Sequence, residues 1–472
     1  MIRIIFILLF VVNSTIYSQN NCNCNETLNK LIIKVEKEYP GFQDKTKDSI
    51  LYNNYKKQLL EISMTTSNES CIDILQKYTA YFRSSHLSIS KLNATLPTVS
   101  KDLIVKDAIE VDIANFNKYV ENSKDSLEGI WTSGSYKVGI IKKANSYNGF
   151  IISSQNESWK PSDVKFKLEQ DGKAVYYMGD HSQNANTFSV VKNSILFFNN
   201  TKVAFIKEFP SPPFTKEEIE AEVNKLEGFY LKPNSDKTLY LKIAGFDPAY
   251  TARIEKLIES SKTLLKSYKN LIIDVRGNGG GSDYSWHPLR PYLYTNQVRG
   301  LGAEYLVTQT LIDGLTNWAN NADKEKYADE IEKVKRDVNR MKGKLGEFIP
   351  TSEEGNAGFF TLDSVYQNPK SVVILVDKDC GSSTEQFLLH AKQSKKVKVF
   401  GTPTYGVLDY SSVRRFDFEC SGYVLMMPTF RVMRLPDYPL DNIGIQPDVF
   451  MDKYIGDWIK YATEYLENKN IQ

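Results

Sequence analysis

Two neighbouring serines stand where a nucleophile would gain the most reactivity. The segment 371–412 opens with the apolar run 372–376, which has the length of a buried strand. Small and polar residues follow, and Ser382 and Ser383 precede a helical pattern with Glu385 in its first turn. A hydroxyl at such a strand-to-helix turn faces the first N–H groups of the helix, which can stabilise an oxyanion. The alternative for such a serine pair is a helix cap.

A second buried strand, residues 270–275, ends in the glycine loop 276–282 (RGNGGGS). This loop lacks the Gly-x-Gly-x-x-Gly spacing of a dinucleotide site and the Lys-Ser/Thr pair of a P-loop, which argues against nucleotide binding. A loop of bare amides beside a strand end serves equally well as an oxyanion hole.

A serine hydroxyl is inert near neutral pH unless a base takes its proton. His86 follows Ser85 in a loop between a helical pattern and a short alternating strand, whereas His181 falls in a β-rich region. His390 comes eight residues after Ser382, about 12 Å along a helix, which is too far. His287, after the glycine loop, is the rival base. The histidines show no metal-ligand spacing, so neither a metal nor another cofactor is expected.

The elements that position these residues fall into several regions. Residues 19–98 contain three amphipathic helical patterns and form the predicted helical domain that carries His86. Residues 120–208 contain short alternating strands between Asn, Ser and Gly turns, which predict a small antiparallel barrel or sandwich. An α/β core follows over 236–455, and a helix over 456–472 closes the chain.

Two predictions concern details of that core. Apolar residues spaced four and three apart predict a helix of about six turns over 321–345, inside an insertion at 315–350 that is either a lid or a plain structural helix. Residues 422–428 and 429–434 are predicted to be two strands.

The chain has 472 residues, enough for two or three domains, and a formal net charge of +2. Without a basic or acidic field, neither nucleic acid nor an anionic membrane is expected as a partner. Residues 1–18 read as a signal peptide cleaved after Ser18, since the apolar run 4–12 is too short to span a bilayer. No later segment spans a membrane, so we expect an exported, soluble protein.

Five cysteines suit an oxidising compartment. We expect Cys71 to pair with Cys22 or Cys24, and Cys380 to pair with Cys420, and the odd number leaves one thiol free.

Four segments occur in an order that carries a family resemblance: LIIDVRGNGGG at 271–281, VVILVDKDCGSSTE at 372–385, GTPTYG at 401–406 and GIQPD at 444–448. Together they resemble the tail-specific, or C-terminal processing, serine protease family, whose catalytic core has a ClpP/crotonase-like fold. The resemblance covers about half of the chain. It implies that Ser382 is the nucleophile, and that the amides of Gly279 or Gly280 and of Ser383 form the oxyanion hole.

One departure from the family bears on the mechanism. The bacterial tail-specific branch uses a Ser-Lys dyad, but Val407 stands where that lysine would be. The branch similar to tricorn protease and to the retinoid-binding repeats uses an upstream histidine instead, and Ser85-His86 looks like its motif. The resemblance therefore implies a triad in which His86 is the general base for Ser382 and Asp441 orients His86, with Ser85 tuning His86. Asp441 stands where that branch has a glutamate, and no PDZ-like domain is recognisable.

The sequence thus predicts an exported serine peptidase that acts on peptides or proteins through an acyl-enzyme, with its oligomeric state left open. Two alternatives remain. One is a non-catalytic protein on the same fold that binds a peptide or an apolar ligand. The other is an acyl-CoA enzyme of the crotonase type. The predicted signal peptide argues against this alternative, because an exported protein is not expected to use a CoA substrate.

Overall fold

The computed structural model describes residues 22–91, 107–325, 327–353, 357–417, 420 and 422–468, so the predicted signal peptide lies outside the described residues. The chain divides into two compact units. The first consists of Met1–Asn93, Glu304–Thr351 and Tyr410–Arg431, and the second of Ala94–Ala303, Ser352–Asp409 and Val432–Gln472. Helices and sheets occur in both units, which confirms the predicted mixed fold.

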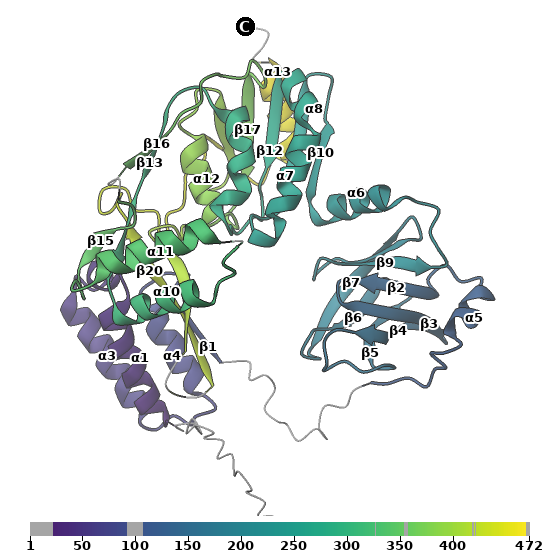
Figure 1. The fold of residues 1–472 in the computed structure, drawn as a ribbon, viewed down its shortest axis with the longest axis horizontal. Helices are drawn as coiled ribbons and strands as arrows, with labels where there is room; N and C mark the ends of the chain where they lie inside the picture. The colour runs from purple at the N-terminus through teal and green to yellow at the C-terminus, as the bar shows by residue number, and fades with distance from the viewer. Residues whose placement is uncertain are drawn as a thin grey trace, which may run out of the picture. The chain divides into compact units, whose positions relative to one another are not determined.

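Helices open the first unit. They are α1 (Cys24–Glu38), α2 (Phe42–Lys45), α3 (Ser49–Ser63) and α4 (Cys71–Ala80), drawn in purple in Figure 1. Asn23 caps α1 and accepts a hydrogen bond from the Glu26 N–H group. The predicted apolar face of α1, which includes Leu28, Leu31 and Val35, is buried. A disulfide between Cys24 and Cys71 joins α1 to α4.

The first unit also contains a five-stranded sheet. Strand β20 (Tyr423–Val432) pairs antiparallel with both β1 (Ser88–Lys91) and β19 (Tyr410–Asp417), and β14 (Ala303–Leu306) and β15 (Phe348–Pro350) complete the sheet. The prediction of two strands over 422–434 is wrong. The strand runs on through Pro428, which lies opposite Val413, and thus the proline does not divide it.

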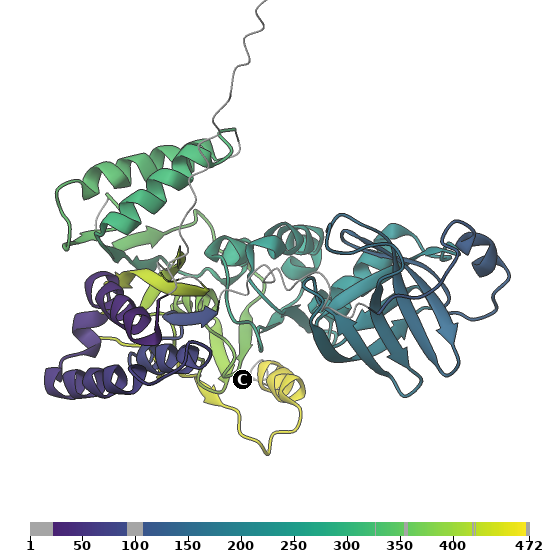
Figure 2. The ribbon, with the colours of Figure 1, turned by 90° about the horizontal axis from the view of Figure 1, so that it is seen from below.

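A helical hairpin inserts between β14 and β15. It consists of α10 (Gln309–Asn321) and α11 (Ala328–Met341), which lie side by side in Figures 1 and 2. The predicted six-turn helix is therefore too long, because α11 ends before Gly343, whose φ of +75° leaves the helical region. Its apolar stripe packs on α10 through Val334, Val338 and Met341. The role of a lid stays a prediction.

The second unit contains the predicted small barrel. Eight consecutive antiparallel strands close on themselves by pairing β2 with β9 (Figure 2). Trp131, Phe166 and Phe198 belong to the buried hydrophobic cluster of this barrel. The strands are β2 (Gly129–Ser133), β3 (Tyr136–Lys143), β4 (Ser146–Ser154), β5 (Val164–Glu169), β6 (Lys173–Tyr177), β7 (Gln183–Val191), β8 (Ile195–Phe198) and β9 (Val203–Phe209). The short helix α5 (Phe116–Glu121) precedes the barrel and α6 (Lys216–Glu227) follows it.

A six-stranded sheet forms the α/β core of the same unit. Its order is β10 (Phe229–Pro233), β11 (Thr238–Ile243), β12 (Asn270–Asp274), β17 (Ser371–Val376), β18 (Val397–Gly401) and β21 (Val449–Phe450). The strands from β11 to β21 run parallel, and only β10 is antiparallel.

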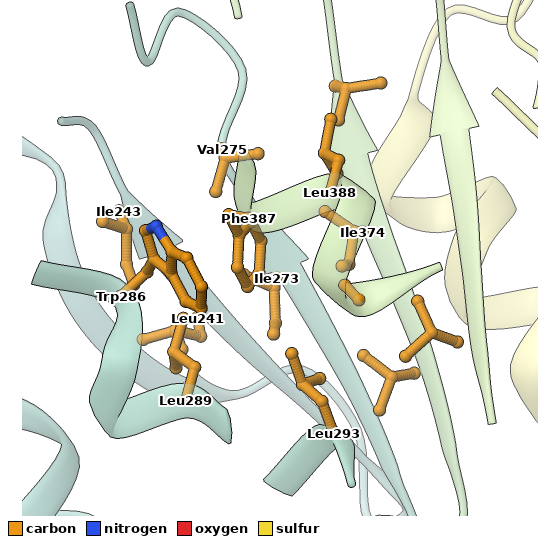
Figure 3. Close-up of a cluster of buried hydrophobic side chains, with 14 of the residues drawn as sticks. Leu241, Ile243, Ile273, Val275, Trp286, Leu289, Leu293, Ile374, Phe387 and Leu388 are labelled. Carbon is orange, nitrogen blue, oxygen red and sulfur yellow. The ribbon is translucent and has the colours of Figure 1, made fainter. Parts of the chain in front are cut away.

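Alternate residues of the central strands face opposite sides of this sheet. Ile273 and Ile374 pack with Phe387 on one face, shown in Figure 3, whereas Ile272 and Val373 pack on the other. Because both faces are covered, the strands read as continuous apolar runs. The first face carries α7 (Thr251–Ser260), α8 (Lys262–Ser267), the 3₁₀ segment η2 (Asp283–Leu289), α9 (Arg290–Leu293) and α12 (Ser383–Ala391), and the second carries α13 (Trp458–Asn468).

The cysteine pairing in the structure agrees with the predicted pairing for one disulfide and differs from it for the other. Cys22 bonds to Cys420, with Cα atoms 5.5 Å apart, and both belong to the first unit. The predicted Cys380–Cys420 bond is therefore wrong. Cys380 is a buried free thiol in the second unit, and its Sγ lies 3.1 Å from the Val275 carbonyl oxygen. Over the described ranges, no helix is long and apolar enough to cross a membrane.

Candidate active site

Ser382 occupies a strained position between β17 and α12. It is the residue just before α12, and its φ of +54° with ψ of −119° is a conformation that residues other than glycine rarely adopt. The Gln386 N–H group donates to the Ser382 carbonyl at 3.1 Å, which starts the helix. Ser382 is half-buried, while Gly381 and Ser383 on either side are buried. Such strain persists only where the surroundings enforce it, and it commonly marks a functional residue.

The glycine loop supplies those surroundings. Strands β12 and β17 are parallel neighbours, and thus the segments that follow them leave the same edge of the sheet. Gly280 has a φ of +104°, and a Cβ atom there would lie 2.6 Å from the Gly381 carbonyl oxygen and 2.8 Å from the Ser383 nitrogen. Only glycine fits so close an approach. The loop and the serine turn are therefore in direct contact.

Asn278 holds the two segments together. It is fully buried, and its backbone oxygen and Oδ1 atom accept hydrogen bonds from the Thr384 hydroxyl at 2.8 Å and 2.9 Å. Its Oδ1 atom also accepts from the Gly280 N–H at 3.0 Å. Within the described residues, the N–H groups of Gly279 and Ser383 donate no hydrogen bond. Two amides at this turn are thus free to bind an anion.

Glu385 fixes the backbone of Ser382. Its buried carboxylate accepts hydrogen bonds from the N–H group of Ser382 at 3.2 Å and from those of Gly406 and Val407 at 2.8 Å and 3.0 Å. The Thr404 hydroxyl donates to it at 2.5 Å. One carboxylate therefore ties the segment 404–407 to the serine turn. The Ser-x-x-Glu spacing of a capping box is the sequence signal for this residue.

The position of the missing lysine also lies at the serine turn. A Cβ atom placed on Gly381 would lie 3.2 Å from Cγ2 of Val407. The Val407 side chain is buried and apolar. Position 407 therefore presents no titratable group to the turn.

Asp441 is a buried carboxylate in the second unit. Its Oδ1 accepts a hydrogen bond from the Asp409 N–H at 2.9 Å, and its own N–H donates to the Asp409 carboxylate at 3.0 Å. Asp409 is in turn paired with the buried Arg434 at 2.7 Å. Sequence reasoning missed Asp409 and Arg434, because neither belongs to a motif with a recognisable spacing.

His86 and Ser85 belong to the first unit, whereas Ser382 and Asp441 belong to the second. His86 is half-buried, and its Nδ1 lies 2.7 Å from the carbonyl oxygen of Tyr410. Because a carbonyl oxygen can only accept, Nδ1 carries the hydrogen in this bond and Nε2 carries the lone pair of the neutral ring. Ser85 is exposed beside it.

Residues 237–451 match the family model described as Peptidase family S41. These residues are a peptidase family S41 domain. The chain therefore contains a domain of a serine-type peptidase family, and the predicted resemblance to the tail-specific protease family is confirmed for these residues. A comparison with curated proteins finds no match.

The chain is similar to several solved structures, of which mature CPAF supports the fold. The crystal structure of mature CPAF is 12% identical, with 94% of this chain and 98% of that chain covered and a TM-score of 0.50. A putative peptidase from Parabacteroides merdae is 14% identical, with coverage of 94% and 97% and a TM-score of 0.46. The photosystem II D1 C-terminal processing protease is 12% identical, with coverage of 93% and 95% and a TM-score of 0.36. At such identities the likeness concerns the fold.

The remaining histidines have different surroundings. His287 and His390 lie in the S41 domain, and burial, assisted by the nearby Arg290 cation, lowers the pKa of each to about 4. Both are therefore neutral near pH 7. His181 stacks on Trp159 with ring centroids 3.9 Å apart and belongs to the barrel region. Among the described residues, no group of acidic, His and Cys side chains is suited to hold a metal ion.

Proposed function

We propose that this chain is an exported peptidase that hydrolyses peptide bonds through an acyl-enzyme on Ser382. The observation that carries the proposal is the serine turn itself. A strained serine stands at the start of a helix, against a glycine loop and beside two amides that donate no hydrogen bond to any residue that the structure describes. A carbonyl seated there would place its oxygen near N–H donors as negative charge develops on it.

The amides of Gly279 and Ser383 are the oxyanion donors of this proposal. The Gly280 amide is the weaker candidate, because it already donates to Asn278 Oδ1 at 3.0 Å. The Ser383 amide also lies in the first turn of α12, where the helix dipole favours a negative charge.

His86 is the proposed general base. Its Nδ1–H group is directed at the Tyr410 carbonyl, which leaves Nε2 as the atom that takes the Ser382 proton. Asp441 is the proposed triad acid and Ser85 tunes the imidazole. Within the second unit the Asp409 N–H group donates to Asp441, and within the first unit the Tyr410 carbonyl accepts from His86.

The proposed reaction has two halves. Ser382 Oγ attacks the substrate carbonyl while His86 Nε2 takes its proton, and the resulting imidazolium gives that proton to the leaving amine. Water then loses a proton to His86 and attacks the acyl-enzyme, and Ser382 regains its hydrogen as the acid product leaves. The negative charge of Asp441 favours the imidazolium in both halves.

Export is part of the proposal. The predicted signal peptide precedes the described residues, and the disulfides Cys22–Cys420 and Cys24–Cys71 suit an oxidising compartment.

Labelling with a fluorophosphonate probe tests the proposed mechanism. We expect labelling of the parent protein, no labelling of Ser382→Ala, and at least a hundredfold slower labelling of His86→Ala. The matched control is His287→Ala, which should be labelled at the parent rate. If Ser382→Ala cleaves an unfolded protein substrate as fast as the parent, the nucleophile is wrong. If His287→Ala loses labelling and His86→Ala keeps it, the base is wrong.

A further inference from the structure

A pocket of about 550 Å³ lies along α12 in the second unit. Its wall includes Gln386, whose N–H donates to the Ser382 carbonyl, and Asp283, whose Oδ1 accepts from the Ser383 hydroxyl at 2.6 Å. Its volume is in the range of small-molecule sites. Because Gln386 is four residues after Ser382, the pocket begins about 6 Å along the helix from the serine turn. A peptide acylating Ser382 would have a neighbouring group within reach of it.

The charged groups of this pocket are mainly cationic. Arg290, Arg299 and Arg434 line it, and Asp283 is the one carboxylate among its described lining residues. His287 and His390 line it too, and their lowered pKa of about 4 keeps them neutral near pH 7. The lining therefore carries a positive excess that a bound anion would balance.

Two buried guanidinium nitrogens in the pocket have no acceptor among the described residues. They are Nη2 of Arg434 and Nε of Arg290. Arg434 is only 6% exposed. Its Nη1 forms an ion pair with the Asp409 carboxylate at 2.7 Å and donates a hydrogen bond to the Tyr438 carbonyl oxygen at 2.5 Å. Leaving a buried cationic donor unpaired is costly, so such groups normally find a partner.

Arg290 forms no ion pair with a carboxylate of the described part of the chain. Its guanidinium lies 4.8 Å from the ring centroid of Trp286 and 5.0 Å from that of Phe360, and both rings line the pocket. Stacking of this kind fixes the plane of a guanidinium while leaving its N–H edge available for a carboxylate. The same rings provide apolar wall for the carbon atoms of a ligand.

We propose that this pocket binds a carboxylate of the peptide substrate through Arg290 and Arg434. The inference rests on the proposed function, since it makes the pocket a specificity site beside Ser382. The carboxylate is either an Asp or Glu side chain or a free C-terminus, because the two present the same planar group to a guanidinium.

Binding to the Ser382→Ala full chain tests the inference without turnover. Three fluorescent hexapeptides are compared: one blocked at both ends with a central Glu, its Gln counterpart, and the Gln peptide with a free C-terminal carboxylate. We expect at least one carboxylate peptide to bind at least tenfold more tightly than the blocked Gln peptide. The peptide that gains affinity identifies the source of the carboxylate. Equal affinity of all three, or no measurable binding of any, would overturn the inference.

Arg290→Gln in the same background should reduce the carboxylate preference to less than twofold. The matched control is Lys395→Gln, which removes one positive charge from an exposed residue outside the pocket and should keep the tenfold preference. Arg434→Gln is less suitable, because Arg434 also pairs with Asp409. A preference that survives Arg290→Gln would count against the assignment.

Fluorophosphonate labelling of Ser382 in the otherwise unaltered chain separates this inference from the proposed function. The probe has no carboxylate, and so its reaction with the parent reports on Ser382 without depending on the pocket. If Ser382 is labelled but the peptides show no carboxylate preference, only the proposed specificity site is wrong. If the parent is not labelled, the proposed function is wrong. The peptide-binding measurement then still decides whether the pocket binds a carboxylate.

Discussion

Gly280 lies so close to Ser382 that a Cβ atom at Gly280 would stand 2.9 Å from the Ser382 Cβ. The two residues are 102 positions apart in the sequence, and the parallel pairing of β12 with β17 brings them together. Since Gly280 also has a φ of +104°, it cannot be replaced without moving the serine turn.

Gly280→Ala should therefore abolish fluorophosphonate labelling of Ser382 and destabilise the chain by roughly 1–3 kcal/mol, from strain and overlap with backbone atoms. Urea unfolding gives the free energy of unfolding. The control for stability is Gly279→Ala, because a Cβ atom there would meet nothing within 4 Å. Equal stability of Gly280→Ala and the parent would contradict the close approach.

Glu385→Gln should destabilise the chain by about 3 kcal/mol and slow labelling of Ser382. An amide group can accept at one atom only, and so some of the four donors that converge on Glu385 would face an NH₂ group. Glu325→Gln provides the control, since Glu325 is exposed. Urea unfolding should give a clearly lower free energy of unfolding for Glu385→Gln than for Glu325→Gln. If both variants unfold like the parent, Glu385 does not hold the turn.

The stability of the chain should fall as the pH drops from about 6.5 to about 4. His287 and His390 each have a pKa lowered from 6.5 to about 4, so the unfolded chain binds protons in this window that the folded chain does not. Proton uptake on unfolding makes stability rise with pH there, and above 6.5 the two histidines contribute no slope.

His390→Gln should flatten this slope, which urea unfolding at several pH values between 4 and 7 would measure. The parent chain, measured at the same pH values, serves as the comparison. An unchanged slope in His390→Gln would mean that other groups cause the pH dependence.

One thiol per chain should react with a disulfide reagent after unfolding, and almost none before it. The two disulfides leave Cys380, whose Sγ is buried and whose thiol pKa is raised mainly by that burial. Titration of the unfolded chain with the disulfide reagent, in guanidinium without reductant, gives the number of free thiols. Three thiols would show that one of the two disulfides is absent, and fast reaction of the native chain would show that Cys380 is accessible.

Breaking the Cys24–Cys71 bond should cost about 2–4 kcal/mol of stability, because it closes a segment with a sequence separation of 47. A Cys24→Ser and Cys71→Ser double variant, compared with the parent by thermal unfolding, measures this cost. Cys380→Ala is a suitable control for the loss of sulfur without the loss of a cross-link. Equal melting temperatures of parent and double variant would argue against the bond.

Local patterns were enough to predict much of the fold. The segments 270–275 and 372–376 are mainly apolar and have the length of buried strands, and such strands lie between covered faces of a sheet. The short alternating segments after residue 125 predicted a small barrel or sandwich, and the structure has a barrel. The order of the glycine loop, the serine turn and the Gly-Ile-Gln-Pro-Asp segment indicated the S41 family.

Other features depend on contacts between distant residues, which periodicity does not report. Cys420 bonds to Cys22 across 398 positions, and the sequence alone favoured Cys380 as its partner. The helix predicted over 321–345 is shorter in the structure and forms one arm of a hairpin. Its apolar stripe packs on α10, and the helix ends before Gly343.

The sequence by itself determined which residues can do chemistry, since the types of Ser382, His86 and Asp441 and the absence of a lysine at 407 are chemical facts of the chain. Only the tertiary structure decided how they are held. The buried Glu385, the Asp409–Arg434 pair and the Tyr410 carbonyl act through hydrogen bonds between segments far apart in sequence. Such bonds depend on where the backbone folds back on itself, and no local pattern of residue types encodes that.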